Sequence, residues 1–153
     1  MRCWIRLASS RAQVREVDAA ITQLLAGREH HLTSIPGLGS VLAATSLAAI
    51  GDVARFPRRE ALVAYAGLDP SVFESGAFHG RRQHISKRGS PYLRRALYLA
   101  AHSAHRRNPD LATYLERKLA EGKSYKAAVV ALAHKLLARI YTVLKEGRPY
   151  QVR

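Results

Sequence analysis

The sequence predicts a mainly α-helical, compact domain, and three observations support this prediction. Apolar residues recur every three or four positions in several segments, capping residues precede those segments, and glycines follow them. With 153 residues, 48% of them hydrophobic, the chain is long enough for one domain with its own core. Residues 71–86 lack helical spacing, and we expect an irregular loop or a small β-hairpin there.

The N-terminal segment carries a heptad-like seam. Its apolar residues alternate by three and four positions, with Ser10 in the missing place: Leu7, Val14, Val17, Ile21 and Leu24. This spacing predicts that residues 1–28 are a coiled-coil stub, which would also serve as a dimer contact. The alternative is an amphipathic helix packed on its own domain. We expect the helix to end near Thr33 and residues 29–153 to form the helical domain.

The later helices each have a start signal and a stop signal. Ser40 can cap a helix that runs to Ile50, and a short helix follows from Arg58 to Ala66. Ser90-Pro91 is a cap followed by proline at the first helical position, and Asn108-Pro109 breaks that helix. The last two helices are expected from Asp110 to Ala120 and from the Ser124 cap to Gly147.

The charge balance is strongly basic. Lys and Arg number 25 against 11 Asp and Glu, which gives a net charge of +14 spread over the whole chain. This excess predicts a polyanionic partner, nucleic acid first and an anionic membrane surface second. The single cysteine, Cys3, excludes an internal disulfide and a cysteine zinc site. We find no signal peptide and no run of about 18 apolar residues, so no membrane span is expected.

The string I-P-G-L-G at residues 35–39 stands between two expected helices. Two glycines allow a tight turn that comes close to a ligand, and the amides at the start of the next helix then face outward. The pattern resembles the helix-hairpin-helix module of non-sequence-specific DNA-binding proteins. The phosphate-binding candidates are Gly37, Gly39 and Ser40. The alternative is an ordinary turn between helices.

A second candidate site is the basic stretch that leads into the helix capped by Ser90. Its fixed cations are Arg81, Arg82, Lys87, Arg88, Arg94 and Arg95, and His84 adds a titratable one. Because a capped helix starts directly behind them, we favour phosphate binding over a merely solvated basic loop.

Ser75 stands in the string F-E-S-G-A. Glu74 is its direct neighbour and no G-x-S-x-G elbow exists, so a protease or esterase triad is not supported. Composition alone favours a turn residue, although a serine oxygen in a basic site can attack phosphorus. The seven histidines form no i, i+4 pair that bears a carboxylate, so we expect no metal site.

An ordered set of short motifs runs from Ile35 to Leu97. It reads I-P-G-x-G, I-G-D, R-F, A-Y-A-G-L-x-P, E-S-G and S-K-x-G-x-x-x-L-R-R-A-L. In this order the motifs resemble the C-terminal domain of bacterial transposases of the insertion sequence 110 family. The last helix and the ending V-L-K-E-G-R-P-Y also match, so the resemblance covers roughly residues 30–150.

The resemblance implies a DNA transposase, or recombinase, whose E-S-G serine attacks DNA and forms a phosphoserine link. In this sequence that serine is Ser75. Family members join this domain, through a coiled coil, to an N-terminal domain similar to Holliday-junction resolvases, whose four acidic residues bind magnesium. Members studied for it use a structured bridge RNA that pairs with target and donor DNA.

The acidic domain is missing from this chain, so we expect a truncated or split member that needs the acidic domain in trans. No cofactor is expected on the chain itself, since magnesium belongs to the acidic domain. The expected partners are DNA, a bridge RNA, and either further copies of the chain or an acidic-domain protein, in the bacterial cytoplasm. The alternative function is a non-catalytic helix-hairpin-helix module that binds DNA or RNA. A helix-hairpin-helix glycosylase is less supported, because Asp52 comes too soon after a short helix.

Overall fold

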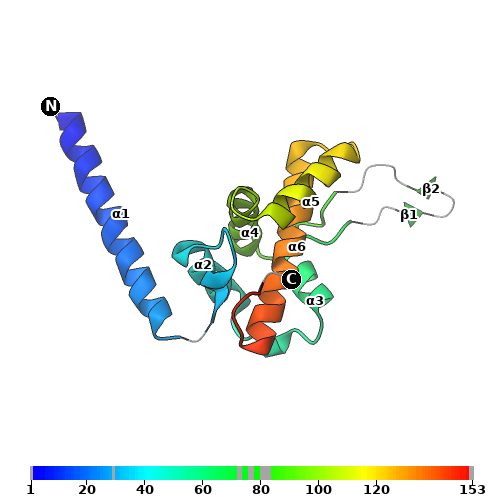
Figure 1. The fold of residues 1–153 in the computed structure, drawn as a ribbon, viewed down its shortest axis with the longest axis horizontal. Coiled ribbons are helices and arrows are strands. Elements are labelled where there is room, and N and C mark those ends of the chain that lie inside the picture. Colours follow the sequence, from blue (N-terminus) through cyan, green and yellow to red (C-terminus); the bar gives the residue numbers. More distant parts are fainter. Residues whose placement is uncertain (1, 29, 72–73, 76–77, 80–83, 152–153) are drawn as a thin grey trace.

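The computed structural model describes residues 2–28, 30–71, 74–75, 78–79 and 84–151. Within these residues the chain is mainly α-helical, as the sequence predicts (Figure 1). The helices are α1 (Arg2–Ala26), α2 (Ser40–Ile50), α3 (Arg59–Ala66), α4 (Pro91–Ala104), α5 (Pro109–Ala120) and α6 (Tyr125–Glu146). Two 3-10 turns, η1 (Leu32–Ser34) and η2 (Val53–Arg55), and two short strands complete the described elements.

The core is built around α6, which packs against α3, α4 and α5. Leu132, Leu136 and Ile140 of α6 have no exposed surface, and each such side chain stabilises the fold by about 1.5–3 kcal/mol. The facing side of α4 is made of small and apolar residues, all buried as expected: Leu93, Ala96, Leu97, Ala100, Ala101 and Ala104. Alanines on this face let α4 approach α6 and α2 closely.

Helix α6 is also long and apolar enough to cross a membrane by length and composition. Its most apolar window has a mean hydropathy of 1.5. The same helix supplies eight buried residues to the core, so its apolar character is explained by packing inside the domain.

The local helix signals are confirmed at most ends. Ser90 Oγ accepts a hydrogen bond from Leu93 N, and Ser124 Oγ accepts one from Ala127 N. Asn108, 4% exposed, caps α5 through its side-chain oxygen. Gly147 ends α6 in the left-handed conformation.

Two predictions about the first helices are wrong. The first helix ends at Ala26 rather than near Thr33, because Gly27 follows and the chain then re-forms only the 3-10 turn η1. The N-cap of α2 is Gly39 and not Ser40, which is the first residue inside the helix. The segment before I-P-G-L-G is therefore a single 3-10 turn, whereas a helix-hairpin-helix module has an α-helix there.

Helix α1 extends away from the rest of the body (Figure 1). Residues 10–20 are all exposed, and Val14 and Val17 each keep 57% of their surface accessible. Among the side chains of α1 that the structure describes, those at its C-terminal end pack on the domain: Leu25 is buried and Ile21 is partly covered. Val14, Val17 and Leu24 of the apolar seam are thus exposed, Ile21 packs in part on the domain, and the side chain of Leu7 lies outside the described residues.

The segment near 71–86 contains the expected small hairpin. Strand β1 (Glu74–Ser75) pairs antiparallel with β2 (Phe78–His79), with Ser75 opposite Phe78. An isolated bridge pairs Pro70 with Ile85 closer to the body. The two strands lie on the opposite side of the body from α1 (Figure 1).

Candidate nucleic-acid interface

The hairpin leaves the body where the end of α3 meets the start of α4. Gly67 caps α3 with a positive φ of 65°, and the amides of Gly67 and Leu68 bond back to Ala64 O and Val63 O. On the returning side, Ser90 N donates to Tyr65 O over 2.7 Å. A Cβ at Gly89 would lie 1.8 Å from that same carbonyl oxygen, so only glycine fits there. We call Tyr65, Gly67, Gly89 and Arg94 the hairpin base.

Arg94 completes the hairpin base. Its Nη1 donates to Ala66 O over 3.0 Å, at the C-terminal end of α3. A cation at the exposed carbonyls of a helix end is favoured by the helix dipole. The sequence predicts phosphate binding for Arg94, but one of its nitrogens is used to hold α3 and α4 together.

Four further hydrogen bonds hold the two legs of the hairpin in register. Ser71 N and Ser71 Oγ both donate to His84 O, over 2.7 and 2.8 Å. Ser86 N donates to Asp69 O over 2.8 Å, and Ser86 Oγ donates to the Asp69 carboxylate. The hairpin is therefore tied to a rigid support at its body end, which positions whatever strand β1 carries.

The predicted site residues divide into described and undescribed ones. Ser75 lies on β1, but its side chain and the whole of Arg81 and Arg82 lie outside the described residues. Lys87, Arg88 and Arg95 are exposed beside the N-terminus of α4. Lys87 adopts a left-handed backbone (φ 56°), and its amide bonds Gly67 O over 3.2 Å. The hairpin base thus brings these three cations to the foot of the segment that carries Ser75.

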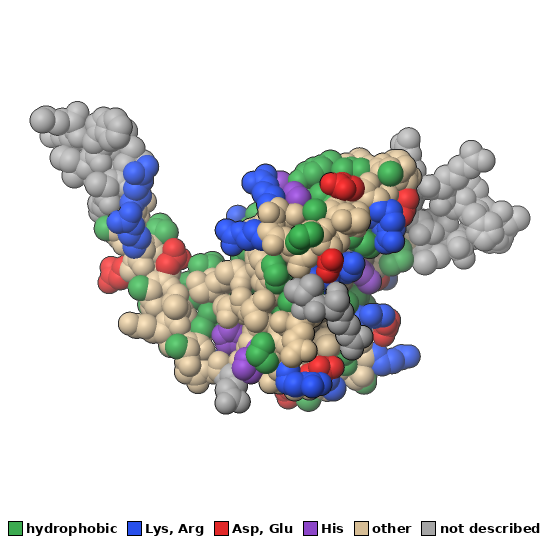
Figure 2. Space-filling view, in the orientation of Figure 1, with side chains coloured by type: hydrophobic (Ala, Val, Ile, Leu, Met, Phe, Trp, Pro, Cys, Tyr) green, Lys and Arg blue, Asp and Glu red, His purple; other side chains and the backbone are tan. Residues whose placement is uncertain are grey.

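The exposed face of α4 continues this basic surface. From Pro91 to Arg107 the chain contains no acidic residue. Its outward side chains follow helical spacing: Tyr92, Arg95, Leu99, His102 and Arg106. His102 accepts or donates a hydrogen bond with the Tyr125 hydroxyl at 3.1 Å and lies 3.5 Å from Arg106 Nη2. Figure 2 shows basic and histidine side chains gathered over α4.

Sequence reasoning missed the aromatic part of this face. Tyr92 is 75% exposed and Tyr125 is 44% exposed, which is unusual for rings of this size. Exposed aromatic rings among cations are typical of surfaces that stack on nucleic-acid bases. The signal was available, because Tyr92 shares the three- and four-residue spacing of Arg95 and Leu99.

The two glycines of I-P-G-L-G have different surroundings. Gly37 is buried against Ala104 of α4 and has a positive φ of 89°. Gly39 is exposed with an ordinary φ of −70°, and no atom lies within 4 Å of a Cβ placed there. Gly37 therefore serves packing, whereas Gly39 and the partly exposed Ser40 lie at a helix start that no side chain caps. The open amides of that first turn are suited to an anion.

The described residues offer no metal centre. Among them, no group of three or more His, Cys, Asp or Glu side chains lies close enough to share an ion.

The comparison with known proteins decides the family. The profile described as "Transposase IS116/IS110/IS902 family" matches residues 29–116, from the segment after α1 into α5. The chain belongs to this family of transposases. The match contains the I-P-G-L-G turn, the hairpin and the whole of α4, so the candidate interface lies within the family's shared region.

Individual relatives agree with the family. The insertion element IS110 43.6 kDa protein of Streptomyces coelicolor is 36% identical over 154 residues, which cover 96% of this chain and 38% of that protein. The pilin gene-inverting protein of Moraxella bovis is 32% identical over 147 residues, 92% of this chain and 46% of that protein. The transposase for insertion sequence element IS1111A of Coxiella burnetii is 34% identical over 121 residues, which cover 77% of this chain and 33% of that protein. The chain spans less than half the length of these relatives.

Proposed function

We propose that the chain is a DNA-binding domain of an insertion-sequence transposase, in which Ser75 is the nucleophile. The supporting observation is the placement of the E-S-G string. Glu74 and Ser75 form strand β1 of a hairpin whose base lies beside the exposed cations Lys87, Arg88 and Arg95. Relatives named as transposases and as a pilin gene-inverting protein support DNA rearrangement as the process served.

The proposed reaction conserves atoms and protons. Ser75 Oγ attacks the phosphorus of a DNA phosphodiester, and a new Oγ–P bond forms. The bond from phosphorus to one bridging deoxyribose oxygen breaks, and that oxygen leaves as a hydroxyl after taking up a proton. The serine proton passes to a base outside the described residues. The product is a serine–DNA phosphodiester, and cations near the phosphate stabilise the charge that develops.

The roles of the other candidates follow from their positions. Lys87, Arg88 and Arg95 are proposed to hold DNA phosphates near the hairpin, together with Arg81 and Arg82. Gly39 and Ser40 are proposed to offer amides of the first turn of α2 to another phosphate. Arg94 and Gly37 are proposed to act indirectly, because they hold α4 in place.

The partners proposed for this reaction are those that the family resemblance implies. A guide (bridge) RNA would choose the DNA, and an acidic domain, which carries the magnesium ligands, would join this domain in trans or as part of a longer protein. The chain alone is then expected to bind DNA without forming a covalent adduct.

A protein–DNA adduct assay tests this proposal. The chain is mixed with the acidic domain of a family relative, magnesium, that relative's guide RNA and labelled DNA. We expect a labelled adduct that survives denaturing electrophoresis. Ser75→Ala should abolish the adduct and leave DNA affinity within about twofold, because a hydroxyl carries no charge.

The matched control is Ser10→Ala, which changes an exposed serine on α1 and should form the adduct normally. An adduct that persists in Ser75→Ala would assign the nucleophile to another residue. DNA binding with no adduct from either protein would favour the alternative, a binding module without chemistry.

A further inference from the structure

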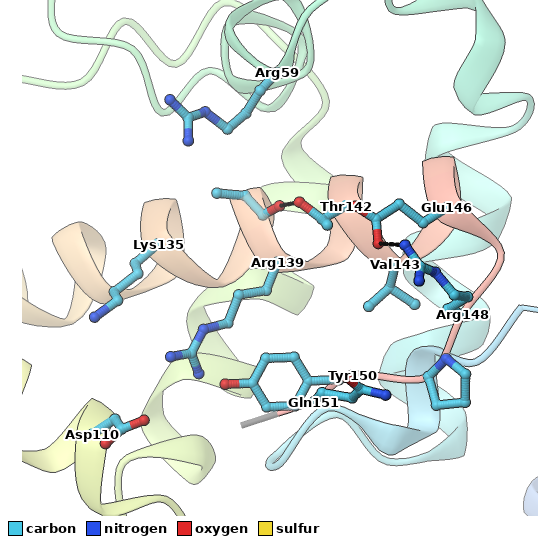
Figure 3. A pocket seen from close by; sticks show the side chains of 12 residues that line it. Arg59, Asp110, Lys135, Arg139, Thr142, Val143, Glu146, Arg148, Tyr150 and Gln151 are labelled. Atoms are coloured by element: carbon cyan, nitrogen blue, oxygen red, sulfur yellow. Dashed lines mark hydrogen bonds and ion pairs between the residues drawn. The ribbon is translucent and has the colours of Figure 1, made fainter. Parts of the chain in front are cut away.

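A second basic site lies between α6, the start of α5 and the C-terminal tail. A cavity of about 670 Å³ opens there (Figure 3). Its lining is Arg59, Asp110, Lys135, Ala138, Arg139, Thr142, Val143, Glu146, Arg148, Pro149, Tyr150 and Gln151. None of these residues belongs to the hairpin, the hairpin base or the exposed face of α4, so the cavity is separate from the site of the proposed chemistry.

The charges that line this cavity are not balanced. Arg148 pairs with Glu146 over 3.1 Å, and Arg59 pairs with Glu60 over 3.2 Å. Lys135 and Arg139 stand one turn apart on α6, and within the described residues neither forms an ion pair with a carboxylate. Figure 3 shows both side chains directed to the same side of α6, with Asp110 beyond them.

Arg139 holds an unused hydrogen-bond donor. Its Nη1 is buried, and among the described residues it has no acceptor. Buried guanidinium nitrogens are normally hydrogen-bonded, because removing an N–H group from water without a partner is unfavourable. Burial, followed by the nearby charges of Arg139 and Arg117, also lowers the pKa of Lys135. The negative charge of Asp110 in this lining raises the pKa of Lys135 but does not offset these effects, so the described lining keeps an excess of positive charge.

Aromatic rings hold the two cations in place. The Lys135 Nζ lies 4.5 Å from the centre of the Tyr114 ring, and the Arg139 guanidinium carbon lies 4.9 Å from the centre of the Tyr150 ring. Tyr150 is itself fixed, because its backbone N–H donates to Ser34 Oγ over 2.8 Å. The positions of the two positive charges are therefore set before any ligand arrives.

We propose that the cavity of Lys135 and Arg139 binds a phosphate group of a nucleic-acid strand. A tetrahedral dianion or diester can accept from the guanidinium fork and the ammonium together. The cavity is larger than a phosphate ion needs, which leaves room for the attached sugar. That the phosphate belongs to nucleic acid rests on the proposed function and on the net charge of +14.

The test measures binding of three ligands by calorimetry: inorganic phosphate, a five-nucleotide single strand and a five-residue polyglutamate peptide. Lys135→Gln and Arg139→Gln should each weaken binding of the oligonucleotide by about tenfold or more. The matched control is Lys145→Gln, which removes an exposed cation of α6 outside the cavity and should change affinity by about twofold at most.

Each outcome has a clear meaning. Equal effects of all three variants on the oligonucleotide would overturn the proposal, because they would show only general loss of charge. Tighter binding of the peptide would overturn it in favour of an acidic protein partner, and loss of inorganic phosphate binding alone would overturn the assignment to nucleic acid. Because Arg139 packs on Tyr150, melting temperatures are compared, and Arg139→Lys, which keeps the charge, should bind the oligonucleotide better than Arg139→Gln.

The test is independent of the nucleophile. Ser75→Ala should bind the oligonucleotide in the cavity like the natural sequence. Failure of the adduct assay would therefore leave this site standing, and failure here would leave the role of Ser75 open.

Discussion

A Cβ atom at Gly37 would lie 2.5 Å from the Cα of Ala104. Helix α4 therefore packs directly on the backbone of the I-P-G-L-G turn. Gly37→Ala would meet this contact and a φ of 89° that side chains rarely adopt. We expect the free energy of unfolding to fall by about 2–4 kcal/mol, from backbone strain and overpacking together. Urea titration measures this change, and an unchanged midpoint would contradict the close packing of the turn on α4.

Substitution of Gly39 should affect DNA binding more than stability. Gly39→Val meets no neighbour and needs no unusual φ. The free energy of unfolding should therefore fall by only about 1 kcal/mol, because valine is a weaker N-cap than glycine. Duplex DNA binding should weaken, because the branched side chain keeps a phosphate from the amides of the first turn of α2. Fluorescence anisotropy measures the affinity. Full affinity in Gly39→Val would remove this turn from the DNA interface.

Salt should weaken DNA binding steeply. Binding through many Lys and Arg side chains releases counterions, so affinity should fall by about 10³-fold or more between about 50 and about 200 mM salt. Changes of duplex sequence should have little effect. Anisotropy titrations at several salt concentrations give the slope, and a flat dependence would contradict a binding surface made of cations.

The exposed seam of α1 should mediate self-association. Val14 and Val17 lie on the exposed part of a helix about 37 Å long, whose C-terminal end alone among its described side chains packs on the domain. If two copies pair along it, Val17→Asp should convert a dimer to a monomer, because a carboxylate would be buried at the seam. Light scattering measures the mass. Glu16→Asp, an exposed neighbour, is the matched control, and an unchanged mass in Val17→Asp would exclude the seam as the contact.

Acid should destabilise the turn that follows α1. Leu32 N donates to His30 Nδ1 over 3.0 Å, which requires the unprotonated nitrogen. Burial, with a smaller effect of His31, lowers the pKa of His30 below 6.5. The unfolded chain therefore binds more protons, so stability is retained above about pH 6.5 and falls as the pH drops below it.

His30→Gln should reduce this dependence when melting temperatures at about pH 8 and about pH 5 are compared. Part of the pH dependence of the melting temperature should remain, because burial also lowers the pKa of His134. His84→Gln is the control, since the contacts described for His84 involve its backbone oxygen. A profile identical to that of the natural sequence would show that His30 does not contribute.

Local signals in the sequence predicted the helices well, because caps act within a few residues. Ser90, Asn108 and Ser124 each bond an amide three positions ahead, which a reader of the sequence can expect. The end of α1 was misplaced because apolar Leu32 continues the helical spacing, although Gly27 had already ended the helix.

The residue roles that the sequence could not predict depend on contacts between residues far apart in the chain. The roles of Gly37 and Gly89 depend on Ala104 and Tyr65, which lie 67 and 24 positions away in the chain. The sequence predicts that Arg94 is a phosphate ligand, whereas the structure shows that its Nη1 donates a hydrogen bond to Ala66 O. The cavity of Lys135 and Arg139 needs three separate segments to close, so its residues look like ordinary surface cations in the sequence.

The hydrogen bond from Tyr150 N to Ser34 Oγ joins the segment before α2 to the segment after α6. Ser34 lies shortly after α1 and Tyr150 shortly after α6, so these two ends of the helical body lie together. A force applied between α1 and the C-terminal segment would therefore act first on this hydrogen bond and on the packing of Leu25, before it reaches the core between α4 and α6.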